Sequence, residues 1–235
     1  MPTEPDDPRA ATPLPPDPAT PPPPPREVPL AQRSSPVNTA LVIGSVLLTL
    51  WTDFGAEPDR VAPWLISLWP AHSPAWLLEV RHGQVWRLFT PVFLHFSWVH
   101  LGMNLLGTFS LTRLLERCLG SRAFLAGAAG LALGSNAAQY FLWGEPGFGG
   151  LSGVLYGFFG YVWLRAYADR EFPLEISRDS LFVALAWYAL CFTGKLGDIA
   201  NTAHTAGLLL GAAWGWWDGR LATRRLPPPV SAPST

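Results

Sequence analysis

The chain has 235 residues, with 16 Lys and Arg, 17 Asp and Glu, and a formal net charge of −1. This balance excludes the strongly basic surface typical of nucleic-acid-binding proteins, so we expect no nucleic-acid partner. Charged residues make up 14% of the chain, against about 25% in a soluble domain. The two cysteines, Cys118 and Cys191, are too few for a disulfide framework and are interpreted as small apolar side chains.

Six uncharged stretches separate the charged residues, and their lengths indicate membrane helices. They are 34–52 (19 residues), 88–112 (25), 123–144 (22), 146–164 (19), 180–194 (15) and 199–217 (19). A helix needs about 17 to 25 apolar residues to cross a bilayer core about 30 Å thick. Five stretches meet that length and 180–194 is slightly short. We therefore expect an all-α membrane protein with six transmembrane helices.

The two ends of the chain differ in composition from this middle part. Residues 1–36 hold fourteen of the 25 prolines, which predicts a disordered cytoplasmic tail. The membrane domain is expected over 37–218, and 219–235 forms a second disordered cytoplasmic tail. The first stretch begins too far from Met1 for a removed signal peptide. If the N-terminus is inside, twelve of the sixteen Lys and Arg lie inside, so both termini are predicted to be cytoplasmic.

Residues 61–78 are nearly uncharged and raise the question of a seventh span. Pro63, Pro70 and Pro74 make a continuous helix improbable there. Tryptophans in the segment, such as Trp64 and Trp69, are typical of the membrane interface. We expect this segment to lie on the outer surface, within a long first external loop.

Polar side chains within the stretches carry the functional hypothesis, because such groups are costly in lipid without a partner or a function. The second stretch carries His95, His100 and Asn104, the fourth carries Gly150-Leu151-Ser152-Gly153, and the sixth carries Asn201 and His204. A helix rises about 1.5 Å per residue, which places Ser152, His100 and His204 each about 20 Å above the inner charged residues and Asn104 about one turn deeper. All four therefore lie in the outer half of the membrane.

Small residues indicate which helices approach each other. Gly153, Gly157 and Gly160 form a stripe on the fourth stretch, and a longer stripe on the sixth contains Ala200, His204, Gly207, Gly211 and Gly215. Such stripes allow close backbone approach in membranes. They could equally serve packing alone.

A serine becomes a nucleophile when a base takes its proton, and acyl transfer also needs donors for the oxyanion. We assign Ser152 as nucleophile and His204 as base. The Ser152 backbone N–H, at a helix start, and the side chains of His100 and Asn104 supply the oxyanion donors. No carboxylate is positioned to orient His204, apart from Asp198 as a weak candidate, so a dyad is predicted. Metal-ligand spacing is lacking, and no metal or cofactor is expected.

These residues together resemble the rhomboid intramembrane serine proteases of the six-span bacterial type. The resemblance covers about residues 38 to 217. It rests on four motifs in order: Trp86-Arg87; His95 with His100-x-x-x-Asn104; Gly150-Leu151-Ser152-Gly153 with Tyr156; and Ala203-His204-x-x-Gly207-x-x-x-Gly211. The fold it implies is a six-helix bundle with a long first external loop.

The resemblance also implies roles for single residues. Ser152 and His204 are the catalytic pair, and His100 and Asn104 line the oxyanion hole. Tyr156 packs on the catalytic histidine, and Gly150 supports the serine. Further implied roles are structural for Trp86, Arg87 and His95, and a substrate gate for the fifth stretch with the loop Phe192–Ile199. Pro91 departs from relatives that have a histidine there.

Three functions compete at this point. The first is an intramembrane serine protease that cleaves transmembrane segments of membrane proteins near their extracytoplasmic end, in a bacterial plasma membrane. The second is a rhomboid-like pseudoprotease that binds transmembrane helices without cutting them. The third, a channel or transporter, predicts polar residues at several depths or inverted repeats. Because serine and histidine are both present and the polar set is confined to the outer half, the protease is favoured.

Overall fold

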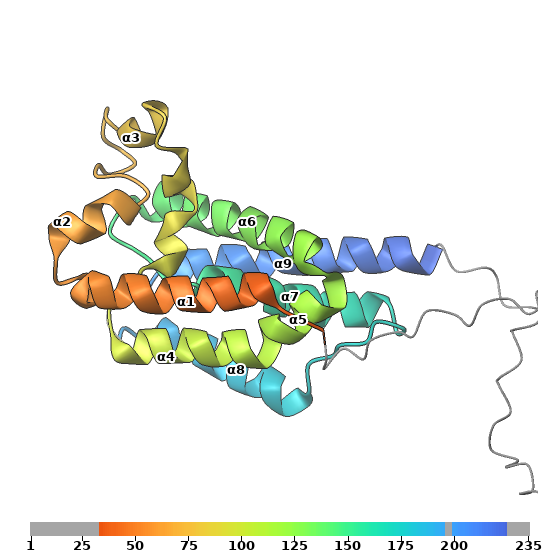
Figure 1. Cartoon of the computed structure of the whole chain (residues 1–235). Coiled ribbons are helices and arrows are strands. Elements are labelled where there is room, and N and C mark those ends of the chain that lie inside the picture. Colours follow the sequence, from red (N-terminus) through yellow and green to blue (C-terminus); the bar gives the residue numbers. More distant parts are fainter. Residues whose placement is uncertain (1–32, 196–198, 225–235) are drawn as a thin grey trace, which may run out of the picture.

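The computed structural model describes residues 33–195 and 199–224, and the regular structure within them is helical (Figure 1). Each uncharged stretch coincides in large part with a main helix. These are α1 (Pro36–Trp51), α4 (Trp98–Gly107), α6 (Ser121–Ala138), α7 (Ser152–Ala168), α8 (Arg178–Cys191) and α9 (Asn201–Arg224). Judged on length and hydropathy together, none of the helices in this part of the chain qualifies as a candidate membrane span. The expected all-helical class is confirmed, while the count of six spans stays a prediction.

Two of these helices continue through a π-helical turn. Helix α4 passes through η6 (Thr108–Thr112) into α5 (Arg113–Leu119), and α6 ends in η7 (Gln139–Trp143). The start of α4 lies ten residues inside the uncharged stretch, because Pro91 sits in a 3-10 turn and Ser97 then caps the helix. The Ser97 hydroxyl accepts the His100 N–H at 3.1 Å.

The tails fall largely outside the described residues, so their expected disorder is not tested. Residues 1–32 and 225–235 lie outside, and α1 begins at Pro36. At the other end α9 continues to Arg224, so the expected domain boundary at residue 218 lies within this helix.

The long first loop is a series of short helical turns, without a continuous helix over 61–78. The turns are η2 (Asp53–Gly55), α2 (Pro58–Val61), η3 (Ala62–Trp64), α3 (Leu78–Arg81), η4 (Val85–Leu88) and η5 (Thr90–Phe93). Arg87 holds them together, since its guanidinium donates to the carbonyls of Ala62 (2.6 Å) and Leu65 (2.9 Å) and to Gln84 Oε1 (2.7 Å). Its expected structural role is confirmed, whereas the Trp86 side chain is exposed.

Helices α7 and α9 lie side by side through the centre of the bundle (Figure 1). Their contact is made by backbone. A Cβ at Gly207 would overlap the carbonyl of Gly153, and one at Gly211 would overlap the carbonyl of Gly157. The two small-residue stripes therefore do face each other, and their close approach fixes how far apart the side chains of α7 and α9 can lie.

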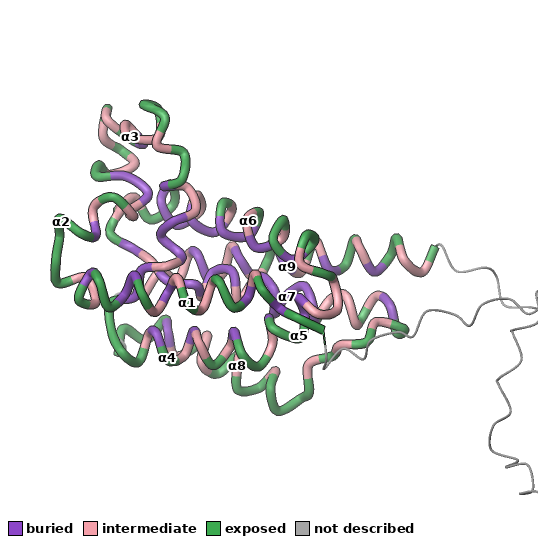
Figure 2. Tube along the Cα trace, viewed as in Figure 1, coloured by how far each residue is buried: buried purple, intermediate pink, exposed green. Residues whose placement is uncertain are grey.

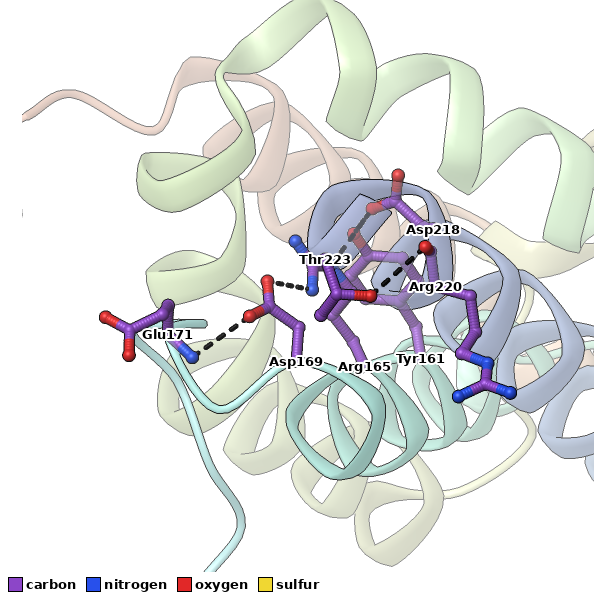
Figure 3. Close-up of polar contacts among 7 residues, drawn as sticks. All are labelled: Tyr161, Arg165, Asp169, Glu171, Asp218, Arg220 and Thr223. Atoms are coloured by element: carbon purple, nitrogen blue, oxygen red, sulfur yellow. Dashed lines mark hydrogen bonds and ion pairs between the residues drawn. The ribbon is translucent and has the colours of Figure 1, made fainter. Parts of the chain in front are cut away.

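A polar cluster joins the same two helices near the C-terminal end of α7 (Figure 3). The Asp218 carboxylate of α9 accepts hydrogen bonds from Tyr161 (2.6 Å) and from Arg165 Nε (3.2 Å) of α7, and Arg165 also pairs with Asp169. Burial opposes ionisation of Asp169, but the hydrogen bond and the charge of Arg165 outweigh it and hold the Asp169 pKa below its ordinary value. The cluster fixes the register of α7 against α9.

Buried polar contacts also occur away from Ser152 and His204. Glu116 of α5 is buried, and its carboxylate accepts the first-turn N–H groups of α1 at Val37 (3.0 Å) and Asn38 (2.6 Å). Thr112 donates to Asn38 Oδ1 at 2.6 Å. These groups are tolerated inside because they satisfy one another, so they form structural contacts and no polar pathway.

Helix α8 differs from the others in its exposure (Figure 2). Cys191 is its one buried residue, whereas Phe182 and Val183 are 73% and 63% exposed. Ser177 caps its N-terminus by accepting the Ser180 N–H at 3.1 Å. The helix therefore forms a peripheral wall of the bundle.

Candidate active site

Ser152 is the first residue of α7, and the chain reaches it through a tight glycine turn. Gly150 has φ of +114°, a conformation that side chains other than glycine rarely adopt. Its N–H donates to the Pro91 carbonyl at 3.0 Å, which ties the turn to the first loop. Because Ser152 begins the helix, its backbone N–H has no partner within the helix.

His204 lies in the first turn of α9 and is 4% exposed. Its Nε2 is 2.7 Å from the Ser152 hydroxyl, which is hydrogen-bond distance between helices that begin 49 residues apart (201 against 152). The contact depends on the glycine-mediated approach one turn below, where Gly207 touches the Gly153 backbone. The structure thus brings together the two residues predicted as nucleophile and base.

His100 and Asn104 follow each other by one turn on α4. A Cβ at Gly150 would lie 2.5 Å from His100 Nε2 and 3.6 Å from the Ser152 hydroxyl, so the imidazole reaches the serine turn. Asn104 is buried, and its Nδ2 donates one hydrogen to the His100 carbonyl at 2.9 Å. An amide nitrogen carries two hydrogens, which leaves the second for an acceptor in the site.

All four of these side chains line one open cavity of about 1570 Å³. Its walls come from α4, α7, α8 and α9, and most of the lining surface is apolar. Val99 and Met103 line it from α4, and Val183 and Trp187 from α8. Polar side chains line it both around Ser152 and at the start of α8, where Ser177, Asp179 and Ser180 contribute.

Tyr156 packs against the histidine as expected, with ring centroids 4.9 Å apart. On the other side of the imidazole, the buried Nδ1 has no hydrogen-bond partner among residues 33–195 and 199–224. Asp198, the weak candidate for a third member, lies outside the described residues, as does part of the loop Phe192–Ile199.

His95, which follows the first loop, contacts the backbone of the turn that leads to Ser152. It is 1% exposed, and its Nε2 lies 3.5 Å from the Leu151 N–H, next to Ser152. Its Nδ1 is 3.2 Å from the Phe93 carbonyl and 3.4 Å from the Thr49 hydroxyl. In the first loop, burial lowers the pKa of Arg87, and the charge of Glu79 opposes that effect.

Sequence reasoning missed polar residues that contact the helix on either side of His204. Gln139 of η7 accepts the Ala203 N–H at 2.9 Å, directly before His204. The Tyr188 hydroxyl of α8 is 2.7 Å from the Thr205 hydroxyl, directly after it. Gln139 could have been found as a buried amide in the third uncharged stretch, but a tyrosine in an apolar helix gives no signal of its own.

Comparison with known proteins agrees with this arrangement. Residues 82–221 match the family model described as the Rhomboid domain. The chain is 36% identical over 197 residues to Rhomboid protease GlpG of Salmonella choleraesuis (strain SC-B67), and 35% identical to the proteins of that name in Salmonella newport (strain SL254) and Salmonella enteritidis PT4 (strain P125109). Each match covers 83% of this chain and 68% of the relative.

The chain belongs to the rhomboid family. It is accordingly a membrane protein and a rhomboid-type intramembrane serine protease, a hydrolase.

Proposed function

We propose that this enzyme cleaves transmembrane segments of other membrane proteins near their extracytoplasmic end, with Ser152 as nucleophile and His204 as general base. The observation that carries the proposal is the 2.7 Å contact between His204 Nε2 and the Ser152 hydroxyl at one end of the open cavity. No cofactor takes part. The chain acts within a lipid bilayer, which in a bacterium is the plasma membrane, with six spans and both termini in the cytoplasm.

The reaction begins when His204 Nε2 accepts the hydroxyl proton and the Ser152 oxygen attacks the scissile carbonyl carbon. Negative charge then develops on the carbonyl oxygen. The Ser152 N–H, the His100 ring and the second hydrogen of Asn104 Nδ2 are the donors for it. Protonated His204 passes its proton to the leaving amine, and the C–N bond breaks. Water then hydrolyses the acyl-enzyme by the same steps, with His204 again as base.

The absence of a carboxylate near His204 in the described residues determines the form of the mechanism. Among residues 33–195 and 199–224, nothing hydrogen-bonds to His204 Nδ1, so within these residues the pair is proposed to work as a dyad. Tyr156 contacts one face of the ring and limits its rotation. Gly150 gives the turn in which the serine and His100 meet.

The test compares detergent-purified wild type with Ser152→Ala and His204→Ala. Wild type is expected to react with a serine-directed fluorophosphonate and to cut a generic transmembrane substrate, and both variants are expected to lose at least about a thousandfold in rate. Ser110→Ala is the matched control, because Ser110 lines the same cavity but only donates to backbone carbonyls of its own helix.

A folded wild type that binds transmembrane helices but neither labels nor cleaves would overturn the proposal in favour of the pseudoprotease. Cleavage that survives in Ser152→Ala would overturn the assignment of the nucleophile and leave the family membership untouched.

A further inference from the structure

The orientation of the His204 ring needs a physical cause. In most serine hydrolases a carboxylate hydrogen-bonded to the second ring nitrogen fixes that orientation. Here the buried Nδ1 has no such partner among the described residues. Hydrogen bonding through Nε2 to Ser152 alone leaves rotation about the side-chain bonds to be limited by packing.

The His204 ring packs against the Tyr156 ring, which in turn packs against a second aromatic ring. The Tyr156 ring lies 4.9 Å from the imidazole, tilted by 39°. The Tyr188 ring of α8 then meets Tyr156 edge-on, at 5.4 Å and 70°. Aromatic rings in this edge-to-face arrangement attract each other beyond the effect of their buried area, so the second ring restrains the first.

Tyr188 is itself fixed by a hydrogen bond that returns to the histidine's own helix. Its hydroxyl is 2.7 Å from the hydroxyl of Thr205, the residue directly after His204. Thr205 also donates to the Asn201 carbonyl at 2.9 Å, so its hydroxyl is held by α9 and is oriented to accept from Tyr188. The four side chains His204, Tyr156, Tyr188 and Thr205 thus form a closed ring of contacts across three helices.

We infer that Tyr188, fixed by Thr205, is a positioning residue that sets the orientation of the His204 imidazole through Tyr156. Tyr188 does not touch the reacting atoms. It takes the place of the orienting carboxylate of other serine hydrolases, through packing instead of charge. The orientation of the His204 ring therefore depends on the position of α8. The inference rests on the proposed function, because it concerns the base of that reaction.

Four variants test it: Tyr188→Phe, Thr205→Val, the double variant, and Thr205→Ser, which keeps the hydroxyl. The measurements are the rate of fluorophosphonate labelling of Ser152, which needs no transmembrane substrate, and kcat and KM for a transmembrane substrate. Loss of one neutral hydrogen bond predicts labelling and kcat lower by about three- to tenfold. KM is expected to stay unchanged, and Thr205→Ser to keep the wild-type rate.

The double variant should be no slower than the slower single variant, because both remove the same hydrogen bond. Tyr167→Phe is the matched control, since Tyr167 is an exposed tyrosine of α7 that packs on Trp216 and not on the site. A rise in KM at constant kcat, additive losses in the double variant, or wild-type rates in Thr205→Val would each overturn the inference. Unlabelled, folded wild type would instead overturn the proposed function, and the inference with it.

Discussion

The contact of α7 with α9 and the placement of α8 represent opposite ways of holding a helix in this bundle. Between α7 and α9, backbone meets backbone at Gly153 and Gly207, and again at Gly157 and Gly211. Helix α8 has one buried residue and is joined to its surroundings by single side-chain contacts. Two of these reach α9: Tyr188 to Thr205, and Asn201 Nδ2 to the Cys191 carbonyl at 3.0 Å.

This difference in packing corresponds to the different parts that the helices form in the site. The proposed nucleophile and base lie on the two helices whose backbones are in direct contact. Closer approach is blocked sterically and separation would lose this packing, so the backbone maintains the 2.7 Å contact between His204 and Ser152. The cavity that must receive a substrate is instead walled by the loosely held α8. Regions with few buried contacts are the ones that open locally at low free-energy cost.

The largest effect is expected from a side chain placed between α7 and α9. Gly211→Leu puts its Cβ into the Gly157 carbonyl, and backbone cannot give way as a flexible side chain would. We expect no folded enzyme, measured by size-exclusion chromatography in detergent and by loss of labelling. Gly130→Leu on α6 is the control, because nothing lies within 4 Å of a Cβ there. A folded, active Gly211→Leu variant would show that the α7–α9 contact does not need glycine at this position.

The same substitution, Phe to Ala, made once in α7 and once in α8, compares how much packing in each helix contributes to stability. Phe158 of α7 is fully buried and stacks on Phe124 at 4.6 Å, whereas Phe182 of α8 is 73% exposed. Phe158→Ala should lower the free energy of unfolding by about 3–5 kcal/mol, because it leaves a cavity. Phe182→Ala should change it by less than about 0.5 kcal/mol. Equal losses in a denaturation series would show that α8 is packed as firmly as α7.

Helix α1 sharpens the comparison, because its first turn is held against α5 by a buried carboxylate. Glu116→Gln replaces one acceptor oxygen by a donor facing the N–H groups of Val37 and Asn38. We expect a loss of about 1–3 kcal/mol, measured by thermal unfolding. The exposed Glu171 offers the control, Glu171→Gln, which should leave the unfolding midpoint unchanged.

The smallest effect concerns the polar cluster at the C-terminal end of α7. The pKa of Asp169 is lower in the folded state than its ordinary value, so its contribution to stability is fully present above that ordinary value. The contribution is lost as the pH falls through the lowered pKa. Asp169→Asn should therefore flatten the decline of stability in this acid range, measured as unfolding midpoint against pH. A decline identical to that of wild type would show that the ion pair adds nothing.

Sequence reasoning reached the centre of the site because its residues give strong signals. Ser152, His204 and His100 are polar groups predicted at matching depth, with Asn104 about one turn deeper, and the glycine stripes identify the helices that meet. The close placement of these residues in the structure follows from that depth and those stripes. The start of α4 was less predictable, since Pro91 lies inside an uncharged stretch whose length alone suggested a helix from residue 88.

The supporting contacts were beyond sequence reasoning for a different reason. Glu116 stands in a charged segment between two apolar stretches, where a solvated side chain is the ordinary expectation, yet it is 1% exposed. Its partners, Val37 and Asn38, are 79 and 78 residues away. They contribute backbone N–H groups, which every residue except proline has and which therefore give no signal in the sequence. Tyr188 and Thr205 are likewise related only through the crossing of two helices.

Glu116, which accepts the first-turn N–H groups of α1, lies far from that helix in sequence, and this has a consequence for the order of assembly. Helix α1 leaves the ribosome before α5, and the first-turn N–H groups of Val37 and Asn38 meet the Glu116 carboxylate only after 79 further residues are made. Until then its N-terminal turn is uncapped and frays. Helix α1 is thus completed only after α5 has been synthesised, so the helix that is made first is not the first to reach its final state.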